Sequence, residues 1–550
     1  MEKESTSPLF ARSMKSLVFT NKLNNQQNCR IPYASPETNP VNMASATPAQ
    51  QQQPALAVAD SSELIRNNAK EAPGTPDSPN QQSESGDKRD PEYPDWDHDP
   101  QNPYNWPSWK KAYIIIMSSA TSFVSSAGTS IISPATEEIK EHFQVSPTVA
   151  LLPLALYIFA LGFGPLLGGP LSETAGRMPI YWVLFPLGAI FTLGAGFADN
   201  FVALCILRFA AGFCYAPTLA VGAGIVTDVF LPQSRGPVMA IWILMPFLGP
   251  GIAPVIGAYA SNRQGWRWTQ WTMLFFSLFC IGLIVFTREC FHPIIKRRLA
   301  KQRGQEVPPS PPLLARLRQF AVVGLVRPLD MMVAEPISTF TCLYVAVNFG
   351  VLFSLFAAVP FIFKMVYNFG VENSGLVFLS VAAGCFIGLA TIMFCNKVLY
   401  LGQKGNFPPN KIPPEYRLYP AMFGSIGLPI GLFWFAWTAR SDISWASPVF
   451  AIVPFAWGNL CVFVSMVQYN ADTYHGSVVA SQAAANSMAR YTFAGAFPLF
   501  VIQMYKGLTI PWAASLLGFV TIALLPIPWV LFKYGARIRK HSRYETVNYD

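Results

Sequence analysis

The stretch LCILRFAAGFCYAPTLAVGAGIVTDVF (Leu204–Phe230) and the stretch PVMAIWILMPFLGPGIAPVIGA (Pro237–Ala258) decide the fold. Each is long enough to cross a bilayer, which takes about 20 mostly apolar residues. A short polar turn that contains Arg235 joins them. Arg208 lies inside the first stretch, where a guanidinium costs about 2.5–3.5 kcal/mol on insertion scales. Such a residue is usually buried in a helix bundle and functional, so we expect Arg208 to face other helices.

The second stretch carries small residues at every fourth position. Gly249, Ala253 and Gly257 follow this spacing, and Pro250 and Pro254 lie between them. Small residues at this interval let two helix backbones approach closely, and prolines bend a helix. We therefore predict a closely packed helix with a conformational hinge at Gly249, Pro250, Pro254 and Gly257.

The composition is that of a membrane protein. Apolar residues make up 52% of the chain and charged residues 13%, whereas soluble domains carry about 25% charged residues. Together with several long uncharged runs, this predicts an all-α polytopic membrane protein. The nine cysteines show no CxxC spacing and the five histidines are far apart, so we expect neither a disulfide framework nor a metal site. Without a GxxxxGK(S/T) loop or a nucleophile–base constellation, we predict no cofactor, no ATP-driven pumping and no enzyme activity.

Long apolar runs recur along the chain and predict about twelve transmembrane helices in two six-helix bundles. The predicted spans lie near residues 111–133, 148–170, 179–198, 201–227, 236–260, 269–290, 335–360, 374–395, 418–438, 444–468, 477–503 and 510–533. The two sets of six flank a basic segment. This order resembles two repeated halves, with a substrate cavity between them near the middle of the bilayer.

Five parts of the chain follow from this pattern. They are a polar, disordered tail (1–105), a first bundle (106–291), a basic linker (292–334), a second bundle (335–535) and a tail (536–550). In the linker, Leu313–Val326 predicts either an amphipathic helix on the membrane surface or a solvated linker. Lys and Arg favour one side of the membrane by about three to one, which predicts that this side and both termini are cytoplasmic. This rule explains the net charge of +9 better than nucleic-acid binding does.

Several motifs resemble those of a known family. GGPLSETAGRMPIYW (Gly168–Trp182) resembles the cytoplasmic loop signature of the major facilitator superfamily, in which an acidic residue, a glycine turn and an arginine lock the two halves. Arg208 stands where that superfamily has its fourth-span arginine, which is linked to proton coupling. The stretch Gly249–Ala258 resembles the fifth-span antiporter signature, although Ala253 and Ala258 replace glycines. The resemblance implies the major facilitator fold.

Further motifs narrow the resemblance to the fungal twelve-span drug:proton antiporters. The motifs are DPQNPYNWPSWKK (Asp99–Lys111), TDVFLPQSRG (Thr227–Gly236), GWRWTQW (Gly265–Trp271), VRPLDMMVAEPI (Val326–Ile337) and ADTYHGSVVASQAAANSMARYTFAGAFPLF (Ala471–Phe500). Met178 departs from the pattern, because many relatives have a second basic residue there. The resemblance implies proton-coupled export, with Arg208, Glu173, Arg177 and Asp228 as candidates for proton coupling or gating. Glu173, Asp228 and Asp472 could equally be fixed members of ion-pair networks, and we favour that alternative for Asp472.

The charges indicate the type of substrate. Arg208 and Arg490 are the cations deep in predicted spans, while the carboxylates lie mostly at span ends. A cation carrier normally needs a negative group in its cavity, because an unpaired ammonium is costly to desolvate. We therefore predict a neutral or anionic amphipathic substrate in preference to a polyamine. The alternative that one arginine is structural, capping carbonyls at a helix break, stays open.

Polar and aromatic side chains inside the spans are candidates for the cavity lining. The candidates are Tyr157, Trp242, Asn348, Phe349, Phe356, Gln468, Tyr469, Asn486 and Arg490. Apolar walls with a few polar groups suit amphipathic organic molecules. Packing is the alternative for the aromatic residues, and bonding between helices is the alternative for the amides.

The leading hypothesis is a proton-driven exporter of drugs, fungicides or secondary-metabolite toxins in the plasma membrane. The alternatives are a polyamine exporter of the same fold and a membrane sensor that does not transport. The expected partners are a small-molecule substrate, protons and membrane lipid, with no nucleic acid, and the protein is expected to be a monomer.

Overall fold

The computed structural model describes residues 96–231, 234–303, 324, 326–408, 412–475 and 477–547. Contacts divide the chain into Met1–Asp87, which lies outside the described residues, and Lys88–Asp550. In the described ranges the regular structure is helical, with one isolated antiparallel bridge between Tyr474 and Thr546. The prediction of an all-α protein is confirmed.

Six membrane-length passes form the first half. Its helices are α2 (Ser108–Ala127), the short α3 (Thr136–Phe143), α4 (Leu152–Leu161), α5 (Gly164–Ala175), α6 (Arg177–Gly196), α7 (Phe201–Val229), α8 (Arg235–Gln264) and α9 (Arg267–Val285). The predicted span 148–170 comprises α4 and α5, which are separate helices because the chain turns at Gly162 and Phe163.

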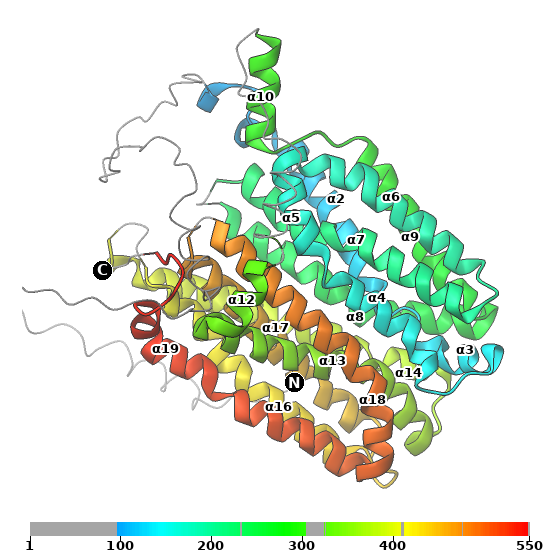
Figure 1. Ribbon diagram of the computed structural model, residues 1–550. Helices are drawn as coiled ribbons and strands as arrows, with labels where there is room; N and C mark the ends of the chain where they lie inside the picture. The colour runs from blue at the N-terminus through cyan, green and yellow to red at the C-terminus, as the bar shows by residue number, and fades with distance from the viewer. Residues whose placement is uncertain are drawn as a thin grey trace, which may run out of the picture. The chain divides into compact units, whose positions relative to one another are not determined.

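The second half repeats this arrangement. Its helices are α13 (Pro336–Tyr367), α14 (Val371–Leu376), α15 (Leu379–Phe394), α16 (Tyr419–Thr438), α17 (Ala446–Thr473), α18 (Ser477–Leu524) and α19 (Pro526–Arg539). The helices α10 (His292–Gln302) and α12 (Arg327–Ala334) lie between the halves in sequence. In Figure 1 the helices coloured blue to green lie together, and so do those coloured green to red.

The described helices account for about twelve membrane passes. Ten helical runs are long and apolar enough to cross a membrane, and one of them is the 62-residue run Val478–Arg539. That run holds two passes, because Thr509 has a φ of 66° and interrupts α18. The 20-residue α2 supplies the remaining pass.

Two chain boundaries differ from the sequence prediction. Residues 96–105, assigned to the tail, form two 3₁₀ turns, and the buried Trp96 ring lies 5.7 Å from the ring of His292 at the start of α10. The C-terminal segment pairs with the end of α17 through Tyr474 and Thr546. Trp96 packs on α10 beside Ile295 and Leu299, and Tyr544 packs partly buried against the main core. Aromatic burial of this kind is concealed by the polarity of the surrounding sequence. Most of the predicted surface helix Leu313–Val326 lies outside the described residues.

The halves meet along two seams. Helix α4 packs against α18, and α8 packs against α14 and α15. At one end of the bundle, the Ser133 hydroxyl donates to the carbonyl of Phe356 (2.5 Å), and the Asn262 amide donates to Glu372 (3.1 Å). We call this the Glu372 end, and the opposite end the Arg177 end.

Two prolines of α8 are matched by serines, Ser126 in the last turn of α2 and Ser130 just after it. A proline at position i has no N–H for the carbonyl of residue i−4, so Pro250 and Pro254 free the carbonyls of Pro246 and Pro250. The Ser126 hydroxyl donates to the Pro246 carbonyl (2.5 Å), and the Ser130 hydroxyl donates to the Pro250 carbonyl (3.4 Å). The helix stays continuous through Pro250 and Pro254, and Ser126 and Ser130 satisfy the carbonyls that these two prolines free.

The small residues of α8 allow this close approach. A Cβ at Gly249 would lie 2.8 Å from the backbone nitrogen of Ala127, and one at Gly257 would overlap the carbonyl oxygen of Ile131. Ala253, between them, is buried. The prediction of close packing is confirmed, and the role of these residues as a hinge stays a prediction.

The contact at Gly257 can be tested by thermal unfolding of the purified protein in detergent. We expect Gly257→Val to lower Tm by about 5 °C, since overpacking costs about 1–3 kcal/mol. Gly282→Val on α9 is the matched control, because a Cβ at Gly282 meets no atom within 4 Å. Equal Tm values for the two variants would contradict the packing role of Gly257.

Candidate functional site

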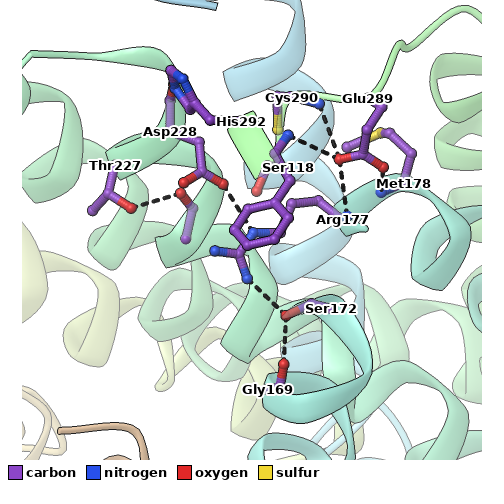
Figure 2. Close-up of polar contacts among 12 residues, drawn as sticks. Ser118, Gly169, Ser172, Arg177, Met178, Thr227, Asp228, Glu289, Cys290 and His292 are labelled. Carbon is purple, nitrogen blue, oxygen red and sulfur yellow. Dashed lines mark hydrogen bonds and ion pairs between the residues drawn. The ribbon is translucent and has the colours of Figure 1, made fainter. Parts of the chain in front are cut away.

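Arg177 forms the centre of a polar cluster at the start of α6. Its Nε donates to Asp228 Oδ2 at the end of α7 (2.9 Å), and its Nη1 donates to the Ser172 hydroxyl of α5 (2.7 Å). Figure 2 shows the guanidinium between these two partners. The guanidinium also lies 4.6 Å from the ring centroid of Phe291. Arg177 thus ties three helices of the first half together.

Glu289 supplies a second carboxylate that the sequence analysis missed. Its oxygens accept hydrogen bonds of 2.9–3.0 Å from the backbone N–H groups of Arg177, Met178, Cys290 and Phe291. The first two begin α6, so this carboxylate caps the helix and interacts favourably with its dipole. The available sequence signal was an acidic residue directly after the sixth apolar run.

The turn before α6 requires glycine. Gly176 has a φ of 102°, and a Cβ there would overlap Glu289 Oε2. Glu289 also lies beside Cys290, whose pKa is raised by burial and by the charges of Asp228 and Glu289. The glycine of the loop motif therefore serves a close approach between a backbone turn and a buried carboxylate.

The four proton-coupling candidates separate into three locations. Arg177 and Asp228 are paired, whereas the Glu173 side chain is exposed on α5. Met178, at the position where relatives have a basic residue, is fully buried. Arg208 lies elsewhere on α7, so the sequence candidates do not form one site.

Arg208 satisfies backbone carbonyls at helix breaks. It is 1% exposed, and its Nη2 donates to the carbonyl of Gly128, just after α2 (2.6 Å). Its Nε donates to the carbonyl of Pro153 near the start of α4 (3.4 Å), and its guanidinium lies over the Tyr157 ring. Tyr157 in turn donates to the carbonyl of Ser125. These contacts support the alternative that Arg208 is a structural arginine, which caps carbonyls at a helix break.

The second half has a counterpart of the Arg177 cluster. Arg417 Nε, just before α16, donates to Asp472 Oδ2 near the end of α17 (2.8 Å), and Arg417 Nη1 donates to Asn396 Oδ1 (3.1 Å). Beside it, Arg539 pairs with the buried Glu415 (2.9 Å). Both Arg–Asp pairs join the start of the third pass of a half to the end of its fourth pass, which supports the inference of a repeat. For Asp472, the pair with Arg417 supports the alternative that we favoured, a fixed member of an ion-pair network and not a proton-coupling residue.

Arg490 lies in a different environment. It is 9% exposed, and its guanidinium lies over the rings of Phe349 (4.9 Å), Phe463 (4.7 Å) and Tyr491 (4.5 Å). Phe247 of α8 contacts the first two rings, with centroids 5.6 and 5.0 Å apart. The first half therefore contributes to the surroundings of an arginine from the second half.

The other cavity candidates are spread over the bundle. Trp242 is buried on α8 and donates to the Ser118 hydroxyl (3.1 Å), while Gln468 lines a small gap between α8, α15 and α17. Asn348 and Asn486 are buried. Two aromatic candidates have contacts that support a packing role and not a place in the cavity lining. Tyr469 lies against Gly535 of α19, and Phe356 stacks on Phe378.

A model of the Major Facilitator Superfamily matches residues 119–498. The chain belongs to this superfamily. Among its relatives is polyamine transporter 4 of Saccharomyces cerevisiae, 34% identical over 469 residues that cover 80% of this chain and 71% of that protein. Another is the efflux pump FUB11 of Gibberella moniliformis, 33% identical over 451 residues, which cover 80% of this chain and 75% of that protein. The predicted fungal efflux family is confirmed.

The facilitator also shares its fold with solved transporters. A D-xylose–proton symporter is 17% identical, has a TM-score of 0.54, and covers 76% of this chain and 97% of its own. The superfamily and the relatives are transporters, so this facilitator is a secondary transporter and not an enzyme.

Removal of Glu289 tests the cap of α6 in this facilitator. We expect Glu289→Ala to lower the Tm of the purified protein by about 5–10 °C, since buried N–H groups would lose a charged acceptor. Glu173→Ala is the control, and we expect it to leave Tm within about 1 °C. A Glu289→Ala variant as stable as the Glu173→Ala variant would contradict the cap.

Proposed function

We propose that this facilitator exports small amphipathic organic compounds in exchange for protons, by alternating access across the plasma membrane. The observation that carries the proposal is Arg490, a buried cation that lies over the rings of Phe349 and Phe463, against which Phe247 of the first half packs. Such a chamber suits molecules that have an apolar body and a neutral or negative group. The relative named an efflux pump supports the direction of transport.

The contacts between the halves support a specific state. Hydrogen bonds and close packing join the halves at the Glu372 end, where Gly375 meets Ala258. The basic linker and the Arg177 cluster belong to the opposite end, which the excess of Lys and Arg assigns to the cytoplasm. The Glu372 end is then extracellular, and this state is closed toward the outside. Both termini are cytoplasmic, and the protein works as a monomer.

Asp228 is our candidate for the proton site. It is the carboxylate that holds the Arg177 guanidinium, so its protonation would release the link between α6 and α7. Arg208 would act as a positioning residue, because its donors are engaged with carbonyls. The driving force is sufficient: about 2.3 kcal/mol per charge at 100 mV and about 1.4 kcal/mol per pH unit support a substrate gradient of several hundredfold.

Polyamine export is the second candidate, because a polyamine transporter is 34% identical to this chain. The acid-poor surroundings of Arg490 disfavour it, since a polycation would enter without a carboxylate partner.

A transport assay in inside-out vesicles separates the two candidates. We expect an imposed pH gradient to drive uptake of a neutral amphipathic drug, with spermidine uptake no higher than in vesicles that lack the protein. A proton ionophore should abolish the drug uptake. Uptake that survives collapse of the gradient would reject antiport, and saturable spermidine uptake would reject the charge argument.

A double-mutant cycle tests whether Arg177 and Asp228 act as a unit. We expect Arg177→Ala and Asp228→Asn each to lower the rate of proton-driven transport about tenfold or more, with the double variant no slower than either. The Arg267–Asp199 pair, also 2.9 Å apart but with an exposed carboxylate and a half-buried arginine, is the control, and Arg267→Gln should transport within about twofold of wild type. Additive losses at Arg177 and Asp228 would contradict coupled action.

A further inference from the structure

One face of α18 carries a row of buried hydrogen-bond donors. Gln482, Asn486 and Arg490 are four residues apart, so they lie on the same face with about 6 Å of helix rise between neighbours. They are 4%, 3% and 9% exposed. Within the described part of the chain, Gln482 Nε2, Asn486 Nδ2 and Arg490 Nε have no hydrogen-bond partner. We call these three residues the donor row.

Helix α13 adds a fourth donor. It packs against α18 and carries Asn348, which is 1% exposed and whose side-chain amide lacks a partner among the described residues. Buried polar groups are nearly always hydrogen-bonded, and a set that is not deserves an explanation. Four such side chains on two adjacent helices indicate a place where something else binds.

The surroundings of Arg490 determine which group fits. The rings of Phe349, Phe463 and Tyr491 lie against its guanidinium and stabilise the charge through their π faces. The rings supply no acceptors for the N–H groups in the guanidinium plane. Of these groups, Nη2 donates to the Ser487 hydroxyl on α18 (3.4 Å), and Nε has no partner among the described residues. A ligand with two coplanar acceptor oxygens would satisfy that plane, and a carboxylate has this geometry.

The same two helices carry further positive charge toward the Glu372 end. Lys364 follows Asn348 on α13 by 16 residues, and Lys506 follows Arg490 on α18 by 16 residues, which is about 24 Å of helix. Both lysines line a cavity of about 420 Å³ between the halves. Lys140 and Glu137 line it as well and are paired with each other. An anion that leaves Arg490 toward this end would therefore meet a net positive charge from Lys364 and Lys506.

We propose that the donor row and Asn348 bind the carboxylate of an amphipathic organic acid, and that Lys364 and Lys506 attract the same group at the exit. The inference rests on the proposed export function and specifies its substrate class. The apolar part of the ligand packs against Phe349, Phe463 and Phe247. The contacts of Arg490 within the described residues are aromatic rings and the Ser487 hydroxyl, so a cationic compound meets no carboxylate there and is excluded by like charge.

Fluorescence polarisation with the purified full-length protein in detergent tests the charge preference. Three probes share one neutral dipyrromethene–boron dye: the dye-propionic acid, its amide and its aminoethyl amide, with charges of −1, 0 and +1 at pH 7. We expect the acid to bind at least tenfold more tightly than the amide, which corresponds to about 1.4 kcal/mol, and the amine to bind most weakly. Equal affinities of the wild-type protein for the acid and the amide would by themselves overturn the proposal.

Substitutions then assign the preference to Arg490. We expect Arg490→Gln to weaken binding of the acid at least tenfold and binding of the amide less than twofold. Arg490→Lys should fall between, because it keeps the charge but not the planar donors. Arg440→Gln, at a half-exposed pair with Asp442, is the control. Equal losses for the acid and the amide in Arg490→Gln would show a structural role and overturn the proposal.

Transport of the same probes separates this inference from the function on which it rests. In proteoliposomes with an imposed pH gradient, we expect the acid to be carried faster than the amide. If the amide is carried and the acid is not, proton-coupled export stands and the carboxylate site is rejected. If selective binding of the acid persists but a pH gradient drives none of the probes, the export function is rejected and the binding site stands.

Discussion

The need to satisfy backbone groups inside a membrane shapes the first half of this transporter. Hydrocarbon offers no hydrogen bonds, so each carbonyl that a proline or a helix end sets free needs a donor from the protein. Ser126 and Ser130 donate to the carbonyls freed by Pro250 and Pro254 of α8, and Arg208 donates to the carbonyls of Gly128 and Pro153. The close packing of α2 and α8 at Gly249 and Gly257 follows from this need, because the serine hydroxyls reach only neighbouring carbonyls.

Charged networks at the Arg177 end stiffen each half separately. Arg177 and Asp228 join α6 to α7, and Arg417 and Asp472 join the corresponding passes of the second half. Glu289 fixes the start of α6 from a position beyond α9. These contacts lie within a half, so each half can rotate against the other without breaking them. Two internally braced bodies that meet along α4–α18 and α8–α15 are suited to alternating access.

Arg208 and Arg490 show that the same signal in sequence can have two physical outcomes. Both are arginines inside long apolar runs, and both are buried. Arg208 donates to two carbonyls and lies on one tyrosine ring, so its charge and its donors are both accommodated. Arg490 has rings on its faces, and its Nε has no acceptor among the residues that the structure describes. The first arrangement is typical of a structural residue, whereas the second is typical of a residue in a ligand-binding site.

Local sequence determined the class of the protein, the positions of most spans and the close packing of α8, because hydropathy, length and small-residue spacing are properties of contiguous residues. The loop motifs likewise identified Arg177 and Asp228 and the superfamily. Only the tertiary structure decided which groups meet. Glu289 lies 112 residues from Arg177, and Asp228 lies 51 residues from it, so no local pattern could pair them. That Asn486 Nδ2 and Arg490 Nε lack a partner among the described residues was equally hidden in the sequence, because a partner depends on all the helices that surround a side chain.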